Sequence, residues 1–232
     1  MNTKNVKSKN NPLQQVRSVI DRLIHDGKVT ARSDGSVHDI FPVAINAAQG
    51  RVLRDWIVKE KAVHTIEVGL AWGISALHIC EGLLMNGDKS ANHITIDPFQ
   101  ASQPKFVNCG LQVLEEAGVA SMVEHLSEKS QITLPRFLSE GRQFDFAYVD
   151  GSHLFDAVFL DLIYLGQLVR PEGIIFGDDY QAPAVARAVS FCVKNLGWKL
   201  EELAPPGAGH RWYVLRTVRE PIHREYPHFI EF

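Results

Sequence analysis

The chain has 232 residues, of which 45% are hydrophobic, and carries a formal net charge of −3 at pH 7. This size fits one globular domain with short appendages, and the near-neutral charge gives no sign of a nucleic-acid or anionic-membrane partner. No apolar run approaches the roughly 20 residues that a membrane helix requires. The three cysteines are widely spaced and odd in number, which indicates reduced, buried thiols in a cytoplasmic protein.

The N-terminal quarter of the chain is predicted to contain two helices. Residues 1–12 are basic and have no apolar stretch behind them, so we expect a flexible arm rather than a secretory signal. Apolar residues recur at helical spacing over 13–25, and Gly27 is typical of a helix end. The polar segment 27–39 is expected to be a loop, and a second helix is expected over 43–58.

From residue 63 onward, short apolar strands alternate with helices. The strands are expected at 63–68, 93–96, 122–126, 144–149 and 173–176, and the helices at 74–85, 107–117, 134–138, 155–169 and 184–196. Two further strands, near 198–203 and 211–216, are joined by a turn-rich link that suits an antiparallel hairpin. This order predicts an α/β fold over residues 61–217: a doubly wound, mostly parallel seven-stranded sheet with an antiparallel terminal hairpin.

A glycine-bearing turn follows the first strand of the predicted sheet. The segment from Glu67 to Ser75 reads EVGLAWGIS and contains Gly69 and Gly73. Glycines let a ligand approach the backbone, and the following helix offers free N–H groups. The spacing lacks the third glycine of a dinucleotide-binding fingerprint, and Trp72 is bulky where a pyrophosphate would lie. An acid at the strand end suits a ligand with an ammonium group; a turn without a ligand is the alternative.

A carboxylate follows the second strand, in the run ITIDPF. At this place in the fold, Asp97 can accept hydrogen bonds from both hydroxyls of a ribose. The alternative is a cap of the turn that begins at Asp97 and Pro98. The glycine turn and the acid, in this order, favour a cofactor that contains a nucleoside.

More acidic residues follow the fourth and fifth strands. Asp150 and His153 lie in YVDGSH, and Asp178 and Asp179 lie in IIFGDDY. Because parallel strands end at one edge of the sheet, we expect these side chains to converge. Carboxylates that lie close together require a cation or a proton between them, and oxygen ligands favour a hard ion such as Mg²⁺. The alternatives are a solvated pair at Asp178 and Asp179 and a helix cap at His153.

In this order the motifs resemble those of class I S-adenosylmethionine-dependent methyltransferases, over roughly residues 44–217. The glycine turn is similar to the family's first motif in small-molecule O-methyltransferases. Asp97 matches the acid that binds the ribose, and Ser130 matches the residue that borders the adenine. The resemblance implies S-adenosylmethionine as cofactor. It implies these cofactor-binding residues: Glu67, Gly69, Trp72, Gly73, Ser75, Asp97, Ser130 and Asp150.

Two groups of enzymes within this class resemble the chain in the acidic segments that follow the fourth and fifth strands. The catechol and caffeoyl-CoA type is metal-dependent and has Asp-Asn after the fifth strand, where this chain has Asp178-Asp179. The group that methylates macrolide sugars has an acidic pair there, and an Asp-Gly-Ser-His after the fourth strand, as in this chain. The resemblance implies Mg²⁺ or a similar divalent ion, held by Asp150, Asp178 and Asp179. It also places His153 where the catechol type has a lysine base.

These features predict an enzyme that transfers a methyl group from S-adenosylmethionine to a hydroxyl of a small molecule. The metal would lower the pKa of the hydroxyl, and His153, whose ordinary pKa is about 6.5, would accept its proton. A nicotinamide-dependent oxidoreductase and a non-catalytic S-adenosylmethionine-binding protein are the alternatives. Residues 13–60 are expected to cover the site. The segment 34–42 and the tail 218–232 are expected to hold the residues that select the acceptor. The tail could cover the site, form a dimer contact or be disordered, and a homodimer is left open.

Overall fold

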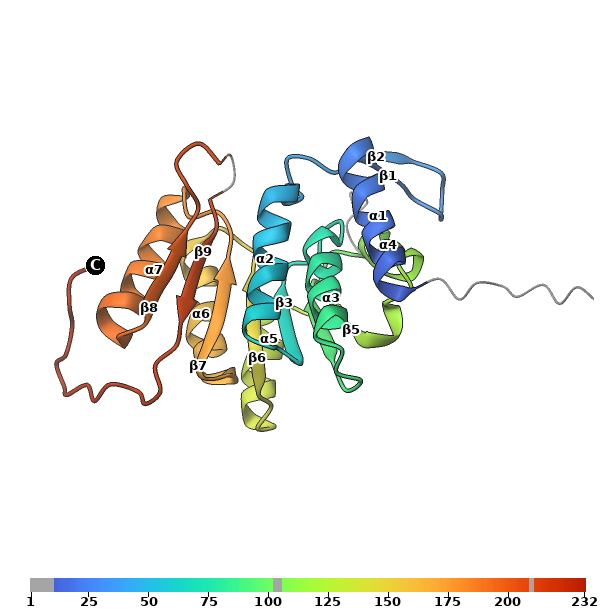
Figure 1. The fold of residues 1–232 in the computed structure, drawn as a ribbon. Helices are drawn as coiled ribbons and strands as arrows, with labels where there is room; N and C mark the ends of the chain where they lie inside the picture. Colours follow the sequence, from blue (N-terminus) through green and yellow to red (C-terminus); the bar gives the residue numbers. More distant parts are fainter. Residues whose placement is uncertain (1–10, 102–105, 209–210) are drawn as a thin grey trace, which may run out of the picture.

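Seven strands form one mixed sheet in the order β5-β4-β3-β6-β7-β9-β8 (Figure 1). The computed structural model describes residues 11–101, 106–208 and 211–232. The strands are β3 (His64–Val68), β4 (Asn92–Ile96), β5 (Val123–Leu126), β6 (Phe144–Val149), β7 (Val169–Gly177), β8 (Lys199–Leu203) and β9 (Tyr213–Arg216). Strands β3 to β7 pair in parallel, whereas β9 is antiparallel to β7 and β8. The predicted doubly wound sheet with a terminal hairpin is confirmed.

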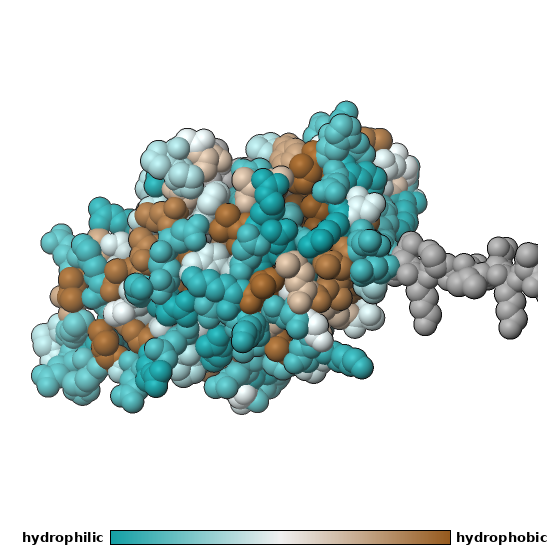
Figure 2. Space-filling model, viewed as in Figure 1, coloured by the Kyte–Doolittle hydropathy of each residue, from teal (hydrophilic) through white to brown (hydrophobic). Residues whose placement is uncertain are grey.

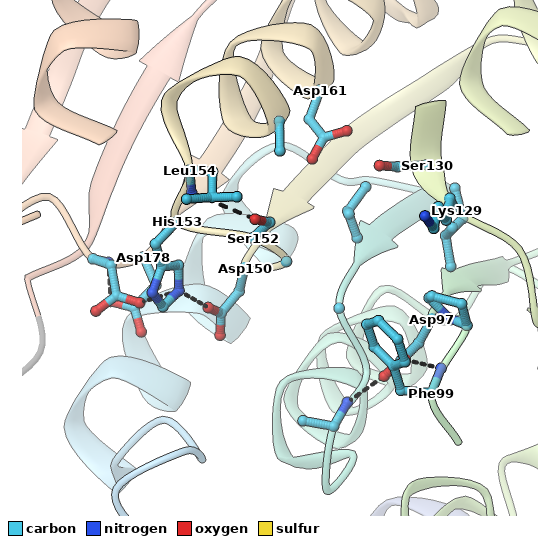
Figure 3. Close-up of a pocket in the computed structure, with 18 of the residues that line it drawn as sticks. Asp97, Phe99, Lys129, Ser130, Asp150, Ser152, His153, Leu154, Asp161 and Asp178 are labelled. Carbon is cyan, nitrogen blue, oxygen red and sulfur yellow. Dashed lines mark hydrogen bonds and ion pairs between the residues drawn. The ribbon is translucent and has the colours of Figure 1, made fainter. Parts of the chain in front are cut away.

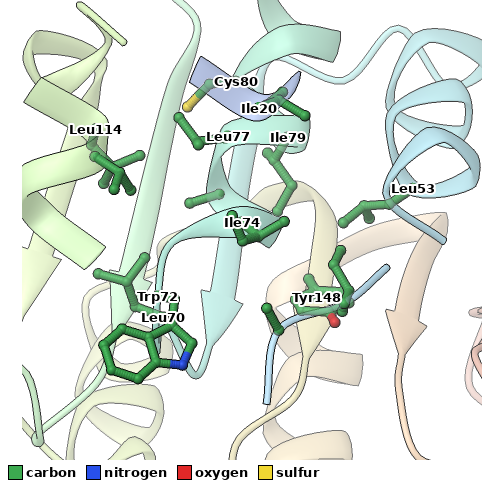
Figure 4. Packing of buried hydrophobic residues seen from close by; sticks show 14 of the residues in the cluster. Ile20, Leu53, Leu70, Trp72, Ile74, Leu77, Ile79, Cys80, Leu114 and Tyr148 are labelled. Carbon is green, nitrogen blue, oxygen red and sulfur yellow. The ribbon is translucent and has the colours of Figure 1, made fainter. Parts of the chain in front are cut away.

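Helices cover both faces of this sheet (Figure 1). They are α1 (Pro12–Asp26), α2 (Ala47–Lys59), α3 (Ile74–Asn86), α4 (Cys109–Glu116), the 3₁₀ turn η1 (Ala120–Met122), α5 (Ser130–Ser139), α6 (Phe155–Leu168) and α7 (Pro183–Leu196). Alternate residues of β6 enter different cores: Phe146 and Tyr148 join the α1–α4 side, part of which Figure 4 shows, and Ala147 joins the α5–α7 side. Since both faces are covered, the central strand β6 (FDFAYV) and the second half of β7 (GIIFG) are mostly apolar.

The segment 27–39 departs from the prediction of a loop. It contains a two-stranded antiparallel hairpin of β1 (Lys28–Thr30) and β2 (Val37–Asp39). Val29 is the one buried residue of β1, and β2 has none. Strands this short and this polar leave no alternating apolar pattern in the sequence, which is why the loop prediction was wrong here.

The first two helices end and begin where their capping residues lie. Gly27 ends α1 in the left-handed conformation, as predicted. The second helix begins at Ala47 rather than at 43. Asn46 fixes this start, because its side-chain oxygen accepts hydrogen bonds from the backbone N–H groups of Ala48 and Gln49 at 3.0 Å each.

The predicted N-terminal arm lies almost entirely outside the described residues. Cys80, Cys109 and Cys192 are buried free thiols, in agreement with the sequence. Among the described helices, none combines the length and the apolar character needed to cross a membrane. Figure 2 shows one face of the molecule, which is mostly hydrophilic with apolar residues in separate small groups.

The C-terminal tail packs against α6 and α7. Asn195 of α7 is 1% exposed. Its Nδ2 donates to the carbonyl of Ile230 at 2.8 Å, and its Oδ1 accepts from the N–H of Ile230 at 2.7 Å. The ring of Phe232 stacks on Phe155 at the start of α6 and packs edge-on against Phe191 of α7. The end of the chain is therefore held on this helical layer.

Asn195→Ala is expected to lower the free energy of unfolding by about 1–3 kcal/mol, because two hydrogen bonds to the tail are lost. Urea denaturation followed by circular dichroism measures the change. Lys194→Ala is the control, since the exposed Lys194 makes one bond to the same tail, to the carbonyl of Glu231, and should cost at most about 0.5 kcal/mol. A variant at position 195 as stable as the unmodified protein would show that the tail is not held in this way.

Candidate active site

A cavity of about 680 Å³ lies at the carboxyl edge of the sheet. Its walls include Gly69 after β3, Asp97 after β4, Asp150 after β6 and Asp178 after β7 (Figure 3). In open α/β sheets, ligands bind beyond the carboxyl ends of the strands, where the strand order reverses. Here the order reverses between β3 and β6, and the cavity lies over that point.

The predicted site residues divide into two groups. Seven of them line the cavity: Gly69, Asp97, Ser130, Asp150, His153, Asp178 and Asp179. Four lie outside its lining: Glu67, Trp72, Gly73 and Ser75. The N-terminal segment also contributes to the wall, through Pro42 and Val43.

The carboxylate of Asp97 holds the glycine turn in place. Its Oδ2 accepts hydrogen bonds from the N–H groups of Leu70 at 3.1 Å and Ala71 at 2.9 Å, and from Gln100 Nε2 at 3.1 Å. Its Oδ1 accepts from the N–H of Phe99 at 2.8 Å, which is the turn cap considered as the alternative. Within the described residues Oδ1 takes this single bond, so a lone pair can receive a ligand hydroxyl. The two readings of Asp97 are compatible.

Two glycines of the turn are required by backbone packing. Gly69 has φ +95°, and a Cβ there would lie 2.1 Å from the carbonyl oxygen of Asp150. Gly73 has φ +82°, and a Cβ there would lie 2.9 Å from the carbonyl oxygen of Gly110. Only glycine tolerates both the left-handed conformation and this approach. The first glycine therefore brings the turn after β3 against the loop after β6.

Glu67 and Ser75 bind each other below the turn. Glu67 is fully buried, and its Oε2 accepts a hydrogen bond from Ser75 Oγ at 2.9 Å. Its Oε1 lies 3.5 Å from Nε2 of the buried His93. These partners tie the end of β3 to the start of α3. Glu67 and Ser75 are not among the residues that line the cavity, and their role as cofactor contacts stays a prediction.

Trp72 also points away from the cavity. It is 2% exposed and belongs to the core on the α1–α4 side (Figure 4). Its ring meets Phe106 edge-on, with 5.0 Å between centroids, and lies 5.5 Å from the ring of His38. Phe106 does line the cavity. Trp72 thus supports a wall residue from behind, and its role as a direct cofactor contact stays a prediction.

At one end of the cavity, His153 lies between two carboxylates (Figure 3). Its Nε2 is 2.7 Å from Oδ2 of Asp179 and 3.7 Å from Oδ1 of Asp150. Tyr148 donates from its hydroxyl to Oδ2 of Asp150 at 3.1 Å and so orients that carboxylate. One potential ligand atom from each of Asp150, His153 and Asp179 lies within 4.8 Å of the others. Two oxygens and a nitrogen at this separation can hold a divalent cation.

The position of Asp178 differs from that of its neighbour. Its Oδ1 accepts a hydrogen bond from the N–H of Asp179 at 2.7 Å. It lines the cavity, but it is not in the group of close ligand atoms found among the described residues. Asp179 has φ 58°, a strained conformation for a residue with a side chain. Of the predicted metal ligands, the structure brings together Asp150 and Asp179 beside the predicted base His153, and Asp178 is not in this group.

Protonation in this group follows from burial and charge. Burial raises the pKa of Asp150 to about 7, against the opposing effect of its hydrogen bond with His153. Hydrogen bonds to Asp150 and Asp179 raise the pKa of His153 to about 10. The imidazole is therefore protonated at neutral pH while both carboxylates face it. A general base must be neutral, so its partners have to be engaged elsewhere before it can accept a proton.

The sequence analysis did not single out Asp161, which is buried and lines the cavity. It lies on the inward face of α6, among the buried Val158, Leu162 and Leu165. An acid in the middle of an apolar helical stripe is an exception to the pattern of a buried face. That exception was the signal available in the sequence.

Comparison with known proteins agrees with this geometry. The methyltransferase domain family matches residues 66–180, about half of the chain. Among curated protein sequences, none matches this chain. Similar solved structures include cofactor-bound Rv0187 from MTB, with 20% identity, a TM-score of 0.64 and 93% of each chain covered. An O-methyltransferase from Bacillus cereus in complex with SAH has 16% identity and a TM-score of 0.64, with 92% of this chain and 93% of that chain covered.

A third similar structure is the O-methyltransferase TomG from Streptomyces achromogenes, involved in tomaymycin synthesis and solved in complex with SAM. It has 19% identity and a TM-score of 0.63, and 91% of each chain is covered. These structures share the fold. The domain match identifies the chain as a methyltransferase, and its sheet has the fold of the class I, S-adenosylmethionine-dependent enzymes.

Asp97→Ala is expected to weaken S-adenosylmethionine binding about tenfold or more, because hydrogen bonds to a charged group contribute about 1.5–3 kcal/mol each. It should also lower the free energy of unfolding by about 3 kcal/mol, since the buried N–H groups of Leu70 and Ala71 lose their acceptor. Titration calorimetry and urea denaturation measure the two effects. Asp88→Ala, which removes an exposed turn cap, is the control. Unchanged affinity at position 97 would exclude it from the ribose site.

Proposed function

We propose that this methyltransferase transfers the methyl group to a hydroxyl oxygen of a small molecule, assisted by a divalent cation and by His153. The observation that carries the proposal is the group of Asp150, His153 and Asp179, which shares one cavity with Asp97. A pair of carboxylates suited to a cation, together with a histidine suited to accept a proton, then lies beside the site expected for the ribose. Similar structures with the same fold are O-methyltransferases by their descriptions.

The residues present fit a hard divalent ion such as Mg²⁺. Asp150 and Asp179 would hold it through carboxylate oxygens, with Asp178 on the same wall of the cavity. A bound ion of this kind lowers the pKa of a coordinated hydroxyl and orients it. The carboxylates are buried in part and lie close together, so they repel one another unless a cation or the proton of His153 lies between them.

His153 is proposed to accept the proton of the acceptor hydroxyl. The two carboxylates raise its pKa, so the ring holds a proton while they face it. When the carboxylates bind a cation, their attraction for the imidazolium weakens, and the pKa falls towards its ordinary value of about 6.5. A neutral ring at the cavity wall can then take a proton at neutral pH.

The charge of the cavity favours a cationic cofactor over a nucleotide diphosphate. Five carboxylic acids line it, against two basic side chains, Lys129 and His153. The acids are Asp97, Asp150, Asp161, Asp178 and Asp179. A sulfonium and an ammonium group are attracted to such a surface, whereas the pyrophosphate of a nicotinamide dinucleotide is repelled. This argues against the oxidoreductase alternative.

Removing the metal is expected to abolish turnover and leave cofactor binding intact. The measurements are release of S-adenosylhomocysteine with a panel of hydroxylated acceptors, and calorimetry with S-adenosylmethionine, each with and without chelator. Asp179→Ala should act in the same way, because it removes one of few protein ligands. Asp156→Ala, an exposed acid at the start of α6, is the control. Full activity with chelator and in Asp179→Ala would point instead to metal-free transfer with His153 alone.

His153→Gln is expected to lower turnover about 10²–10⁴-fold, the usual size of a general-base effect. The loss of turnover should be smaller at high pH, where the acceptor hydroxyl ionises without a base. The same substitution should also change the number of protons that the protein releases when Mg²⁺ binds. At pH 8, Asp150 is mostly ionised and His153 still protonated, given pKa values of about 7 and about 10. Cation binding lowers the second pKa, so protons are released, up to one per site.

Calorimetry in two buffers with different ionisation enthalpies counts these protons. The variant at position 153 should still bind the cation but release fewer protons, because only Asp150 remains to lose one. If this variant releases as many protons as the unmodified protein and is fully active, His153 is a helix cap and not the base.

A further inference from the structure

A glutamine beside the acidic end of the cavity binds one of the two carboxylate oxygens of Asp179. Figure 3 shows this end of the cavity, with His153 next to Asp150. The Nε2 of Gln181 donates a hydrogen bond to Oδ1 of Asp179. The other oxygen, Oδ2, lies 2.7 Å from Nε2 of His153. The two oxygens of this carboxylate therefore have different neighbours, and Oδ2 is the one on the side of the proposed cation.

The orientation of the Gln181 amide is fixed by the backbone. Its Oε1 accepts a hydrogen bond from the N–H of Arg211 at 3.2 Å. A backbone N–H only donates, so the amide oxygen faces Arg211 and the amide nitrogen faces the carboxylate of Asp179. The N–H of Tyr180 donates to the carbonyl of Arg211 at 2.8 Å, which joins the same two segments through the main chain. The donor that Asp179 receives is therefore held in one direction.

The main chain of Asp179 is also held by hydrogen bonds. Its N–H donates to Oδ1 of Asp178 at 2.7 Å, and its carbonyl accepts from the N–H of Ala182 at 2.8 Å. These bonds hold the residue in the left-handed conformation, with φ 58°. The carboxylate can therefore turn only about its side-chain bonds, and the hydrogen bond from Gln181 opposes that rotation.

The number of oxygens that Asp179 offers affects which cation suits the site. Ca²⁺ takes about six to eight oxygen ligands and often binds both oxygens of one carboxylate, whereas the smaller Mg²⁺ requires a near-octahedral arrangement. A carboxylate whose Oδ1 is engaged by an amide presents one oxygen to the ion, which suits Mg²⁺. Without that amide, the same carboxylate could turn and bind a larger ion through both oxygens.

We propose that Gln181 is a positioning residue that limits Asp179 to one oxygen towards the cation and so makes the site prefer Mg²⁺ over Ca²⁺. This proposal rests on the cation proposed above, which Asp150 and Asp179 would hold. Gln181 is not among the residues that line the cavity. It therefore acts through Asp179 and not on the acceptor.

A purely structural role is the competing explanation. Gln181 could serve only to join its turn to the segment that contains Arg211. Its replacement would then lower the free energy of unfolding and weaken the binding of both cations by the same factor, because neither ion would gain an oxygen ligand. The ratio of the two affinities separates the explanations.

The test is titration calorimetry of the full chain with Mg²⁺ and with Ca²⁺. Gln181→Met keeps the length of the side chain and removes the donor to Asp179. The affinity for Ca²⁺ relative to that for Mg²⁺ should rise about tenfold in this variant, the lower end of what partners of metal ligands contribute. Gln167→Met is the control, because Gln167 is an exposed residue whose amide donates to a carbonyl of its own helix; this variant should keep the ratio.

Circular dichroism checks that each variant is folded, which we expect because Gln181 is exposed. If Gln181→Met is not folded, Gln181→Ser is used, whose side chain is too short to reach Oδ1 of Asp179. A folded variant with the ratio of the unmodified protein, or one that binds neither ion, overturns the role of Gln181 and leaves the cation site standing. Absence of Mg²⁺ binding in the unmodified protein overturns both.

Discussion

One carboxylate organises the cofactor end of the cavity and links it to the other end. Asp97 ends β4, yet its Oδ2 binds the backbone of Leu70 and Ala71 in the turn after β3. That turn approaches the loop after β6 so closely that only Gly69 fits against the carbonyl of Asp150. The same loop carries the acid and the histidine of the opposite end. Because interiors are close-packed, a displacement of the turn is transmitted to the acidic group.

The charge of Asp150 and Asp179 can be neutralised by a proton on His153 or, as proposed, by a divalent cation. Hydrogen bonds to Asp150 and Asp179 raise the pKa of His153, so a proton on this imidazole offsets part of the charge of the two carboxylates. A divalent cation would take over this role and free the ring for proton transfer. The strained backbone at Asp179 fits a position set by charge and ligands rather than by local conformational preference.

The sequence predicted the sheet and its edge better than the direction of individual side chains. Apolar runs and their alternation with helices fix which residues follow each strand, so Asp97, Asp150 and Asp178 fall at the cavity. Direction depends on tertiary partners that one sequence does not reveal. Ser75 engages Glu67, and Trp72 packs against Phe106. Only the packing of α5 against α6 brings Ser130 to the buried acid on the second helix.

The excess of acids has opposite effects on binding and on the proposed chemistry. A negative cavity attracts the sulfonium cofactor and holds the product, which has lost the positive charge on sulfur, less firmly, and this difference favours exchange. Methyl transfer removes the positive charge from sulfur, so the same carboxylates stabilise the starting state more than the transition state. Charge at the acceptor end offsets this. A cation at Asp150 and Asp179, or a proton on His153, lowers the negative potential where the acceptor oxygen loses its proton.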